Sequence, residues 1–261
     1  MNTVICGDGP MGRALADDLR EAGQASRILG RPATGRHPPE AFGGAEVVHE
    51  FSTATAVVAN VSQALGAGCR LLVIGTTGWA NDRHTVERLL VHHGAAAVVS
   101  PTFSPGATVL LRITEQLAGA LGRLGGYDPY VIEWHRAGKR DRPSGTAKEL
   151  ARRLIEAHPS KRQVGGLGAG PAEPEALEVL SLRAGSAPGS HIVGFDAPGE
   201  TFELHLTARD RRSYAAGARL AAAWLGDGRR PPGIHTFESV IAELIDSPRP
   251  NLETRTTGEN H

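Results

Sequence analysis

Cysteine, net charge and long apolar runs are all scarce in this chain, and each shortage excludes a class of protein. The 261 residues include two cysteines, and the formal net charge is +0 at pH 7. Cys6 lies in a short apolar segment and Cys69 just before another, as small buried side chains do, so we expect neither a disulfide, nor a metal site, nor a thiol nucleophile. A neutral chain has no general attraction for nucleic acid or an anionic membrane.

Apolar runs are short throughout the sequence. None reaches the roughly 18 residues that a membrane-spanning helix needs, and the N-terminus has no charged segment followed by a signal-type apolar stretch. We therefore expect a soluble, cytoplasmic protein. The length leaves room for one large domain or two modest ones.

What the chain does have is a glycine-rich turn directly after its first apolar strand. The strand is expected at Thr3 to Cys6, and a helical pattern starts at Ala14 to Leu19. Between them, a Gly-x-Gly-x-x-Gly turn allows a tight bend, backbone approach to a pyrophosphate, and close packing of helix on strand. This pattern predicts a dinucleotide site made by Gly7, Asp8, Gly9, Pro10, Met11 and Gly12.

The end of the second strand bears on the choice of cofactor. That strand is expected at Ser26 to Leu29, with Arg27 inside it, Arg31 after it and no acidic residue before Glu40. An acidic side chain at this place usually marks NAD, whereas a guanidinium suits the 2′-phosphate of NADP. We expect NADPH to be preferred and NADH to be possible. The alternative is that these arginines merely solvate a loop.

The first hundred residues alternate strand-like and helix-like segments, which predicts a doubly wound parallel sheet of the α/β class. Further strands are expected at Glu46 to Phe51, Leu71 to Ile74 and Ala95 to Ser100, with helices at Ala56 to Ala67 and Asp82 to His93. Ligands bind beyond the carboxyl ends of such strands. Small and hydroxylated residues occupy those ends, and we expect cofactor contacts from Ser52-Thr53-Ala54, from Gly75, Thr76 and Thr77, and from Ser100, Pro101, Thr102 and Phe103.

After Ser104 the pattern changes to long helices and meander-like strands, which predicts a smaller α+β domain with a mixed or antiparallel sheet and helices on one face. Strands are expected at Tyr130 to His135, Leu177 to Arg183, His191 to Phe195 and Thr201 to Ala208. Helices are expected at Thr108 to Leu124, Tyr214 to Leu225 and Phe237 to Leu244, with a loop at Gly165 to Pro174 and a polar tail at Pro248 to His261.

The segment from Glu133 to Ala147 is the most informative stretch of the chain. His135 ends an apolar strand, and Ser144 or Thr146 can cap a helix from about Ala147 to Ala157, with Thr146 and Glu149 at capping-box spacing. Free N–H groups at a helix start bind a carboxylate or phosphate, and Lys139 and Arg136 add positive charge. Taken alone, the stretch could equally be a basic solvated loop before an ordinary helix.

Several motifs together resemble the dihydrodipicolinate reductase family, also called 4-hydroxy-tetrahydrodipicolinate reductases, of the diaminopimelate route to lysine. The resemblance runs from the N-terminus to about Leu225. The motifs that support it are Gly7-x-Gly9-x-Met11-Gly12-Arg13, Gly75-Thr76-Thr77-Gly78, Ser100-Pro101-Thr102-Phe103-Ser104, Glu133-x-His135-x-x-x-Lys139-x-Asp141-x-Pro143-Ser144-Gly145-Thr146-Ala147, and Ser181-Leu182-Arg183-Ala184-Gly185.

The resemblance implies a homotetramer of two-domain subunits that reduces a cyclic imine carrying two carboxylates. It implies a Rossmann-type dinucleotide-binding domain at residues 1–104 and 212–261, and a substrate-binding and oligomerisation domain at residues 105–211. By resemblance, His135 is the catalytic proton donor or acceptor and Lys139 the second proton donor. The substrate carboxylate is expected at Ser144, Gly145 and Thr146, held by the backbone N–H groups of the last two.

Three positions depart from the family pattern, and they keep other functions open. The family usually has a second histidine where this chain has Arg136, an asparagine where it has Thr102, and a histidine near Leu206, whose neighbour His205 would point to the opposite face. Arg136 can still clamp a carboxylate. One alternative is a paralogue that reduces another carboxylated imine or enamine; a second is a dinucleotide-binding sensor without catalysis. No histidine group has convincing metal-ligand spacing, so we expect no metal.

Overall fold

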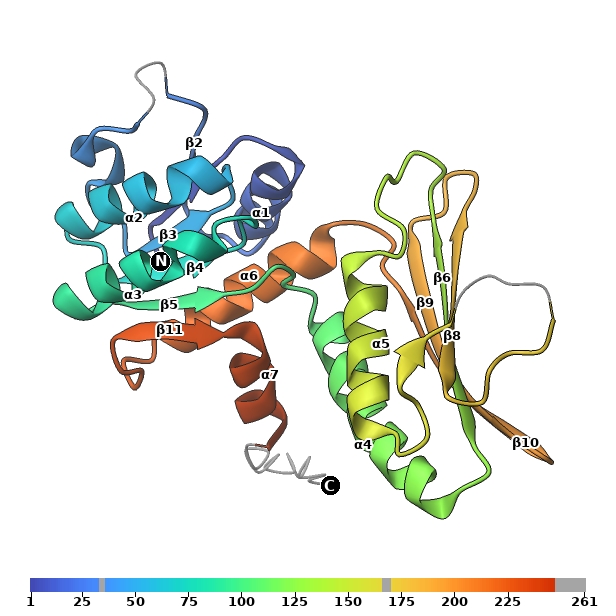
Figure 1. The fold of residues 1–261 in the computed structure, drawn as a ribbon. Helices are drawn as coiled ribbons and strands as arrows, with labels where there is room; N and C mark the ends of the chain where they lie inside the picture. The colour runs from blue at the N-terminus through green and yellow to red at the C-terminus, as the bar shows by residue number, and fades with distance from the viewer. Residues whose placement is uncertain (33–35, 166–169, 247–261) are drawn as a thin grey trace, which may run out of the picture.

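Two β-sheets organise the chain into two lobes (Figure 1). The structure is a computed structural model that describes residues 1–32, 36–165 and 170–246. The first lobe contains β1 (Thr3–Cys6), α1 (Pro10–Glu21), β2 (Ser26–Leu29), β3 (Val47–Glu50), α2 (Val57–Gly66), β4 (Leu71–Ile74), α3 (Arg83–His92), β5 (Ala96–Val99), α6 (Arg212–Leu225), β11 (Gly233–Thr236) and α7 (Phe237–Asp246). Three short 3₁₀ helices lie at Pro39–Phe42, Ala54–Ala56 and Ala80–Asp82.

The first sheet has six strands in the order β11-β5-β4-β3-β1-β2, and all its pairings are parallel. One face packs on α1 and α6 through a cluster that includes Leu15 and Ala218. The other face packs on α2 and α3 through a cluster that includes Val61 and Leu90. Helices on both faces of a parallel sheet confirm the doubly wound α/β fold that the alternation predicts.

The strand order places a ligand crevice at the end of β1. The strands β2 and β3 pair with opposite edges of β1, so successive strands are added on one side of β1 and then on the other. Ligands of open α/β sheets bind at such a switch point. Gly7 stands there with φ +108°, and a Cβ at Gly7 would lie 2.3 Å from the carbonyl oxygen of Phe51. A side chain at position 7 would therefore clash with the backbone of Phe51 at the switch point.

The sequence did not predict β11. This strand has four residues and pairs in parallel with β5, from Gly233 beside Ala96 to Thr236 beside Val99. It follows Pro231-Pro232 and leads directly into α7, so no alternating pattern sets it apart from a loop. Its pairing returns the end of the described chain to the first lobe.

The second lobe contains α4 (Pro105–Leu124), β6 (Asp128–His135), α5 (Gly145–Ala157), β7 (Gln163–Val164), β8 (Ala176–Arg183), β9 (Gly189–Ala197) and β10 (Glu200–Thr207). Its sheet has the order β10-β9-β6-β8-β7. The β6 strand pairs in parallel with β8 and antiparallel with β9, so the sheet is mixed, as expected. The meander-like reading was wrong for β8, which is separated from β9 by β6; β9 and β10 do form a hairpin.

Helices α4 and α5 cover one face of the second sheet (Figure 1). Their core contacts include Leu110, Leu150, Val131 and Phe195. Both helices begin earlier than the apolar pattern alone indicates because a serine caps each of them: the Ser104 and Ser144 hydroxyls accept hydrogen bonds from backbone N–H groups three residues on, each at 3.2 Å.

The capping box predicted at Thr146 and Glu149 was wrong. Ser144 is the N-cap, so Thr146 lies inside the first turn of α5. The Glu149 carboxylate instead accepts hydrogen bonds from Arg152 and Arg153.

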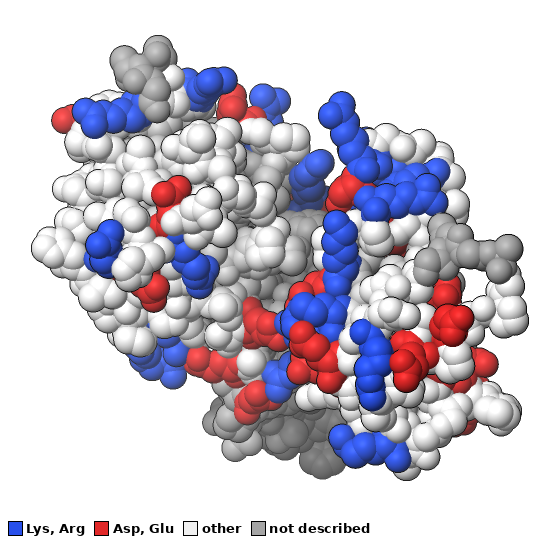
Figure 2. Space-filling view, viewed as in Figure 1, with Lys and Arg blue, Asp and Glu red and all other residues white. Residues whose placement is uncertain are grey.

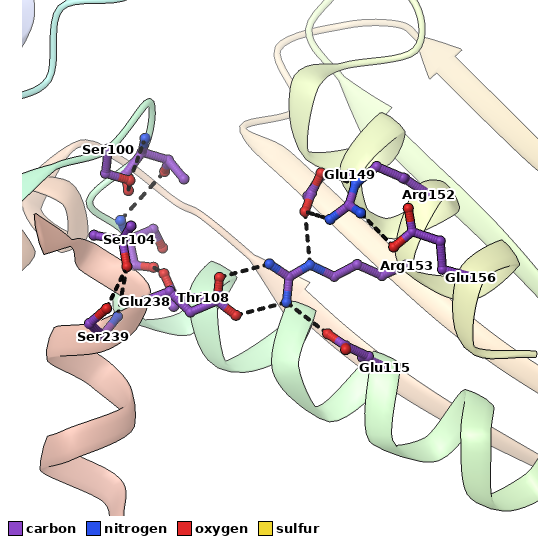
Figure 3. A network of polar contacts seen from close by, with 12 residues as sticks. Ser100, Ser104, Thr108, Glu115, Glu149, Arg152, Arg153, Glu156, Glu238 and Ser239 are labelled. Atoms are coloured by element: carbon purple, nitrogen blue, oxygen red, sulfur yellow. Dashed lines mark hydrogen bonds and ion pairs between the residues drawn. The ribbon is translucent and has the colours of Figure 1, made fainter. Parts of the chain in front are cut away.

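Arg153 connects α5 to helices of both lobes (Figure 3). Its guanidinium makes a two-pronged contact to Glu238 of α7, with both N–O distances at 2.8 Å, and reaches Glu115 of α4 at 3.1 Å. The Arg153 side chain is largely buried, whereas these carboxylates are partly exposed. The contacts help to fix α5 relative to the first lobe.

Both cysteines are buried, as expected, and both are free. Among the described residues, no helix is long and apolar enough to cross a membrane. Part of the loop predicted at Gly165 to Pro174, namely residues 166–169, and the tail predicted at Pro248 to His261 lie outside the described residues.

Candidate active site

A cavity of about 260 Å³ opens at the carboxyl edge of the first sheet. Its walls come from the ends of β3, β4 and β5, together with Met11 of α1 and Tyr214 of α6. Residues expected from the sequence in this wall are Met11, Ser52, Thr53, Ala54, Gly75, Thr76, Thr77, Pro101, Thr102 and Phe103; Phe51 and Tyr214 were not expected. The expected residues Gly7, Asp8, Gly9, Pro10, Gly12, Arg31 and Ser100 do not line the cavity.

Glu50 lies behind the cavity wall and hydrogen-bonds to residues that line it. It is fully buried at the end of β3 and accepts hydrogen bonds from the Ser52 N–H at 3.0 Å, the Asn60 amide at 2.8 Å and the Thr76 hydroxyl at 3.2 Å, besides one from the Ser52 hydroxyl. Burial raises the pKa of the Glu50 carboxyl, and these hydrogen bonds oppose the rise. Since Ser52 and Thr76 both line the cavity, Glu50 holds two of its walls together.

The glycine turn has the geometry that a pyrophosphate needs. A Cβ at Gly12 would lie 2.0 Å from the carbonyl oxygen of Gly7, so α1 can pack this closely only with glycine at position 12. A Cβ at Gly9 would meet no atom within 4 Å, and Gly9 caps α1 without a side-chain hydrogen bond. The helix start is therefore open, and its free N–H groups fit an anion of a dinucleotide.

The arginines at the edge of the first sheet differ in their surroundings. The Arg27 guanidinium donates to the carbonyl oxygens of Ala41 and Gly43 at 2.8 to 3.2 Å, so it braces a loop. Arg31 is exposed and makes no hydrogen bond or ion pair within the described part of the chain. The Asp8 carboxylate lies beside Gly30, 3.6 Å from the position of a Cβ there, so an acidic group does approach the end of β2 from the glycine turn.

A second group of polar residues lies across the second sheet, on the side of α5. In the strand register, Glu133 of β6 stands between Ser181 of β8 and His191 of β9, and Arg183 stands beside His135. Neighbouring residues in register share a face of the sheet, so these side chains meet at the end of β6. Glu133, Ser181 and Arg183 belong to the sequence motifs but had no predicted role, and His191 was not predicted. Spacing along the chain does not reveal which strands become neighbours.

Glu133 is the centre of this group. Its Oε1 atom accepts hydrogen bonds from the Ser181 hydroxyl at 2.6 Å, the Arg183 guanidinium at 2.7 Å and the Ser144 N–H at 2.9 Å. Its Oε2 atom is buried and has no hydrogen bond within the described part of the chain. Burial by itself raises the pKa of the Glu133 carboxyl, but the surrounding donors hold that pKa well below its usual range. Glu133 is therefore an ionised carboxylate inside the protein.

His135 lies against the free oxygen of Glu133. Its Nδ1 is 3.4 Å from Glu133 Oε2 and is buried, whereas Nε2 is accessible, and the side chain as a whole is 11% exposed. The His191 ring stands edge-on to it, with ring centroids 5.2 Å apart. Burial lowers the pKa of His135 to about 4, and the Glu133 carboxylate opposes this. At neutral pH the ring is neutral and has one accessible nitrogen.

The loop after β6 provides several cations around His135. The Lys139 ammonium pairs with Asp141 at 2.7 Å, and Lys139 lowers the pKa of that carboxyl. Arg136 is exposed, and no described residue hydrogen-bonds or ion-pairs with its guanidinium. In Figure 2 the surface is hollowed between the two lobes, and Lys and Arg side chains gather on the second lobe's side of the hollow.

The start of α5 offers two free donors to an anion. Ser144 is buried, and its N–H already donates to Glu133 while its hydroxyl contacts His191 Nε2 at 3.2 Å. The N–H groups of the exposed Gly145 and the half-buried Thr146 have no partner in the described structure. A carboxylate can therefore bind at Gly145 and Thr146, while Ser144 serves the internal network.

Glu133, His135 and His191 have ligand atoms that lie within 4.8 Å of one another, the one such group among the described residues that could hold a metal ion. The Arg183 guanidinium is 2.7 Å from the same carboxylate, and a dication at this place would face its charge. The positive charges around the group favour a hydrogen-bonded role over a metal site.

Two of the positions that depart from the family pattern, Leu206 and Thr102, can be placed in the structure. Leu206 of β10 stands directly opposite His191 of β9, and His205 faces the other way, exposed and paired with Glu203 at 3.0 Å. His191 on β9 therefore lies next to the position where the family usually has a histidine on β10. Thr102 lines the cavity, and its carbonyl oxygen accepts a hydrogen bond from the Ser100 hydroxyl.

Comparison with known proteins gives consistent relatives. The family model described as dihydrodipicolinate reductase, C-terminus, matches residues 106–241. The 4-hydroxy-tetrahydrodipicolinate reductase of Methanococcoides burtonii is 37% identical over 197 residues, which cover 75% of this chain and 72% of the relative. The protein of the same name from Anaeromyxobacter dehalogenans is 32% identical over 252 residues, covering 91% of this chain and 81% of the relative.

Solved structures share the fold. The dipicolinate-bound dihydrodipicolinate reductase of Paenisporosarcina sp. TG-14 has a TM-score of 0.75 at 20% identity and covers 92% of this chain and 98% of its own. An engineered D-amino acid dehydrogenase bound to NADP⁺ has a TM-score of 0.51 at 16% identity, over 95% of this chain and 99% of its own. Identities this low support the two-lobed architecture and nothing finer.

Proposed function

The chain belongs to the dihydrodipicolinate reductase family, and we propose that it catalyses the NAD(P)H-dependent reduction of 4-hydroxy-tetrahydrodipicolinate to tetrahydrodipicolinate on the diaminopimelate route to lysine. The observation that carries the proposal is the loop from His135 to Thr146. It combines an accessible imidazole nitrogen, an ammonium group and two free backbone N–H groups at a helix start.

The substrate carboxylates bind at the start of α5 in this proposal. The N–H groups of Gly145 and Thr146 and the positive end of the helix dipole hold one carboxylate. Arg136, exposed in the same loop, clamps a carboxylate through charge-assisted hydrogen bonds at any physiological pH. The dipicolinate bound by the structural relative is a dicarboxylate, which agrees with this assignment.

His135 and Lys139 move protons in this proposal. His135 presents Nε2 to the substrate, and an anionic substrate favours its protonated form, which offsets the low pKa of the free enzyme. Lys139 pairs with Asp141 and serves as the second proton donor. Asp141 keeps the ammonium at the loop until a substrate carboxylate competes for it.

The first lobe holds the nicotinamide cofactor in this proposal. The turn from Gly7 to Gly12 and the start of α1 bind the pyrophosphate, and the cavity wall that includes Thr76, Thr102 and Tyr214 receives the nicotinamide end. When bound, the cofactor supplies the hydride. The domain bounds follow: residues 1–104 with 212–261 bind the dinucleotide, and residues 105–211 bind the substrate. The cytoplasmic location remains a prediction from the sequence.

NADPH is the preferred cofactor in this proposal, because Arg31 is exposed at the end of β2 and makes no hydrogen bond or ion pair with another described residue, which leaves its guanidinium available to a 2′-phosphate. Asp8 supports NADH as a second cofactor, since a carboxylate beside Gly30 can accept a hydrogen bond from the ribose hydroxyl that NADP lacks. The two residues therefore act in opposite directions on cofactor choice.

A homotetramer is also part of this proposal, and the uncovered face of the second sheet supports a subunit contact. Ile132 pairs with Leu180 and Ile192, and Trp134 pairs with Leu182, so these apolar residues form one patch on the face away from α4 and α5. Trp134, Leu180 and Leu182 are each 45 to 46% exposed in the single chain. Patches of this kind mark protein interfaces.

The test is an assay of NADPH and NADH oxidation with freshly prepared 4-hydroxy-tetrahydrodipicolinate. We expect turnover with both cofactors and a higher kcat/KM with NADPH. Turnover of another carboxylated cyclic imine but not of this substrate would identify a paralogue. Cofactor binding without oxidation of either cofactor on any imine would identify a sensor and would contradict the proposal. Omission of the imine is the control for background oxidation.

A further inference from the structure

The two carboxylate oxygens of Glu133 differ in their hydrogen bonding: Oε1 accepts several hydrogen bonds, and Oε2 accepts none from the described residues. Three donors, from Ser144, Ser181 and Arg183, converge on Oε1 at 2.6 to 2.9 Å. These donors come from the start of α5 and from β8, so they fix the carboxylate plane from two sides. Oε2 is left with two imidazole neighbours, His135 Nδ1 at 3.4 Å and His191 Nε2 at 3.6 Å.

The contacts of Ser144 decide which imidazole supplies a proton to Oε2. The Ser144 hydroxyl accepts the Ala147 N–H as the helix cap, so its own proton needs an acceptor. Among the described residues its other side-chain partner is His191 Nε2, at 3.2 Å, and the direction of that hydrogen bond depends on the His191 tautomer. In either direction Nε2 is engaged with Ser144, which lies closer to it than Glu133 Oε2 does, at 3.6 Å. Oε2 is thereby left to the Nδ1–H of His135.

We propose that Glu133 is a positioning residue that holds the neutral His135 as its Nδ1–H tautomer, so that Nε2 alone faces the substrate. The inference rests on the proposed function, in which His135 exchanges the proton. The separation of 3.4 Å is long for a hydrogen bond, but such contacts often tighten when a substrate binds. Nε2 lies beside Gly189, where a Cβ would approach to 3.2 Å, so the missing side chain leaves that nitrogen room.

The same network ties the orientation of His135 to the carboxylate site. Glu133 accepts the first N–H of the helix start, and Ser144 connects that start to His191. Gly145 and Thr146, which follow, keep their N–H groups for the substrate. The imidazole nitrogen and the carboxylate cradle are therefore built on one rigid support, as a site that must present both at a fixed separation requires.

The charged and titratable groups that face His135 are Glu133 of the same strand, His191 of β9, Arg183 of β8 and Lys139 of the following loop. Of these, Glu133 alone favours the protonated ring, and the other three disfavour it. Loss of the Glu133 charge should therefore shift the limb of the kcat–pH profile that reports His135 to lower pH.

The most direct test is ¹⁵N NMR of the histidine rings in the wild-type protein near neutral pH, with His135→Gln used to assign the His135 signals. We expect a protonated Nδ1 and an unprotonated Nε2. A protonated Nε2, or the mixture of tautomers seen for a free imidazole, would overturn the proposal. The measurement needs no substrate, so its outcome is separate from the outcome of the reductase assay.

Glu133→Gln provides the functional test. The amide oxygen can keep the contacts of Oε1, but the amide NH₂ then faces His135 Nδ1 and favours the opposite tautomer. We expect kcat to fall by at least about 10²-fold, the His135 limb to move to lower pH, and the KM for NADPH to stay within about threefold. A purely structural role would lower the yield of folded enzyme while leaving the pH profile of the folded fraction unchanged, and that result would overturn the proposal.

Two further outcomes are covered. If Glu133→Gln does not fold, the wild-type NMR spectrum decides by itself. Metal analysis of the purified wild-type protein should find no stoichiometric ion at Glu133, His135 and His191; one bound ion per chain, released together with a change in the His135 signals, would show that the carboxylate serves a metal and not a tautomer.

Discussion

His49 is buried in the middle of the first sheet, and neither of its ring nitrogens has a hydrogen-bond partner among the described residues, which makes the stability of the protein sensitive to acid. The residue is 0% exposed and its ring stacks on Phe51 at a centroid distance of 6.1 Å. Burial lowers the pKa of His49 from 6.5 to about 3. The unfolded chain therefore binds a proton at this residue between about pH 6.5 and pH 3, and the folded chain does not.

The sign and size of the effect follow from these two values. The stability contribution of neutral His49 is present above about pH 6.5 and is lost as the pH falls below it, by about 1.4 kcal/mol per pH unit. Between pH 7 and pH 5 the free energy of unfolding should therefore decrease by about 2 kcal/mol because of this residue. His49→Leu removes the titrating group and two unsatisfied nitrogens at similar volume.

Urea unfolding at pH 7 and pH 5 measures the effect. The wild-type protein should lose about 2 kcal/mol more than His49→Leu between the two pH values. His84→Asn, which changes an exposed histidine on α3, is the control and should follow the wild type. An equal loss in His49→Leu and the wild type would mean that His49 is protonated or solvated in the folded state, contrary to this prediction.

Three further predictions concern binding and assembly. Arg31→Ala should raise the KM for NADPH by a factor that corresponds to at most about 2 kcal/mol of lost binding energy, and should raise the KM for NADH far less. Asp8→Asn should affect the KM for NADH more than that for NADPH. Equal effects on both cofactors in steady-state kinetics would contradict the assignment of Arg31. Arg136→Ala should raise the KM for the dicarboxylate substrate about tenfold, and Arg136→His should recover part of the activity near neutral pH; unchanged kinetics of Arg136→Ala would mean a merely solvated side chain. Leu180→Lys should dissociate the oligomer in analytical ultracentrifugation, while the matched control Leu124→Lys, at the 76% exposed end of α4, should not; an intact tetramer of Leu180→Lys would exclude this sheet face as the contact.

Local signals predicted the parts of the fold that depend on local chemistry. The strand Thr3–Cys6 and the glycine turn follow from backbone constraints within ten residues, and the start of α5 follows from the capping ability of Ser144. The start of α4 was expected at Thr108 from the apolar pattern, and the Ser104 cap, which was not predicted, places it earlier, at Pro105. These features need no knowledge of distant contacts.

The remaining features depend on pairings between distant segments. The four-residue β11 exists because β5 offers it a free edge, and no periodicity within Gly233–Thr236 indicates this. Glu133, Ser181 and His191 meet because three strands align in register, so the sequence predicted His135 and Lys139 as a site but not the carboxylate that supports them. His49 sits in an ordinary apolar strand, where a buried imidazole leaves no local pattern.

The central claim is that the loop from His135 to Thr146 performs proton transfer while the first lobe binds the cofactor. The most direct measurement is kcat together with the NADPH dissociation constant for His135→Gln and Lys139→Ala, with Arg140→Ala as the control for loss of a loop cation. We expect kcat to fall at least about 10²-fold in each of the first two variants and less than multiplicatively in the double variant. NADPH affinity should change little, and Arg140→Ala should have little effect. Near-wild-type turnover of His135→Gln and Lys139→Ala, or a parallel loss of NADPH binding and turnover, would contradict the claim.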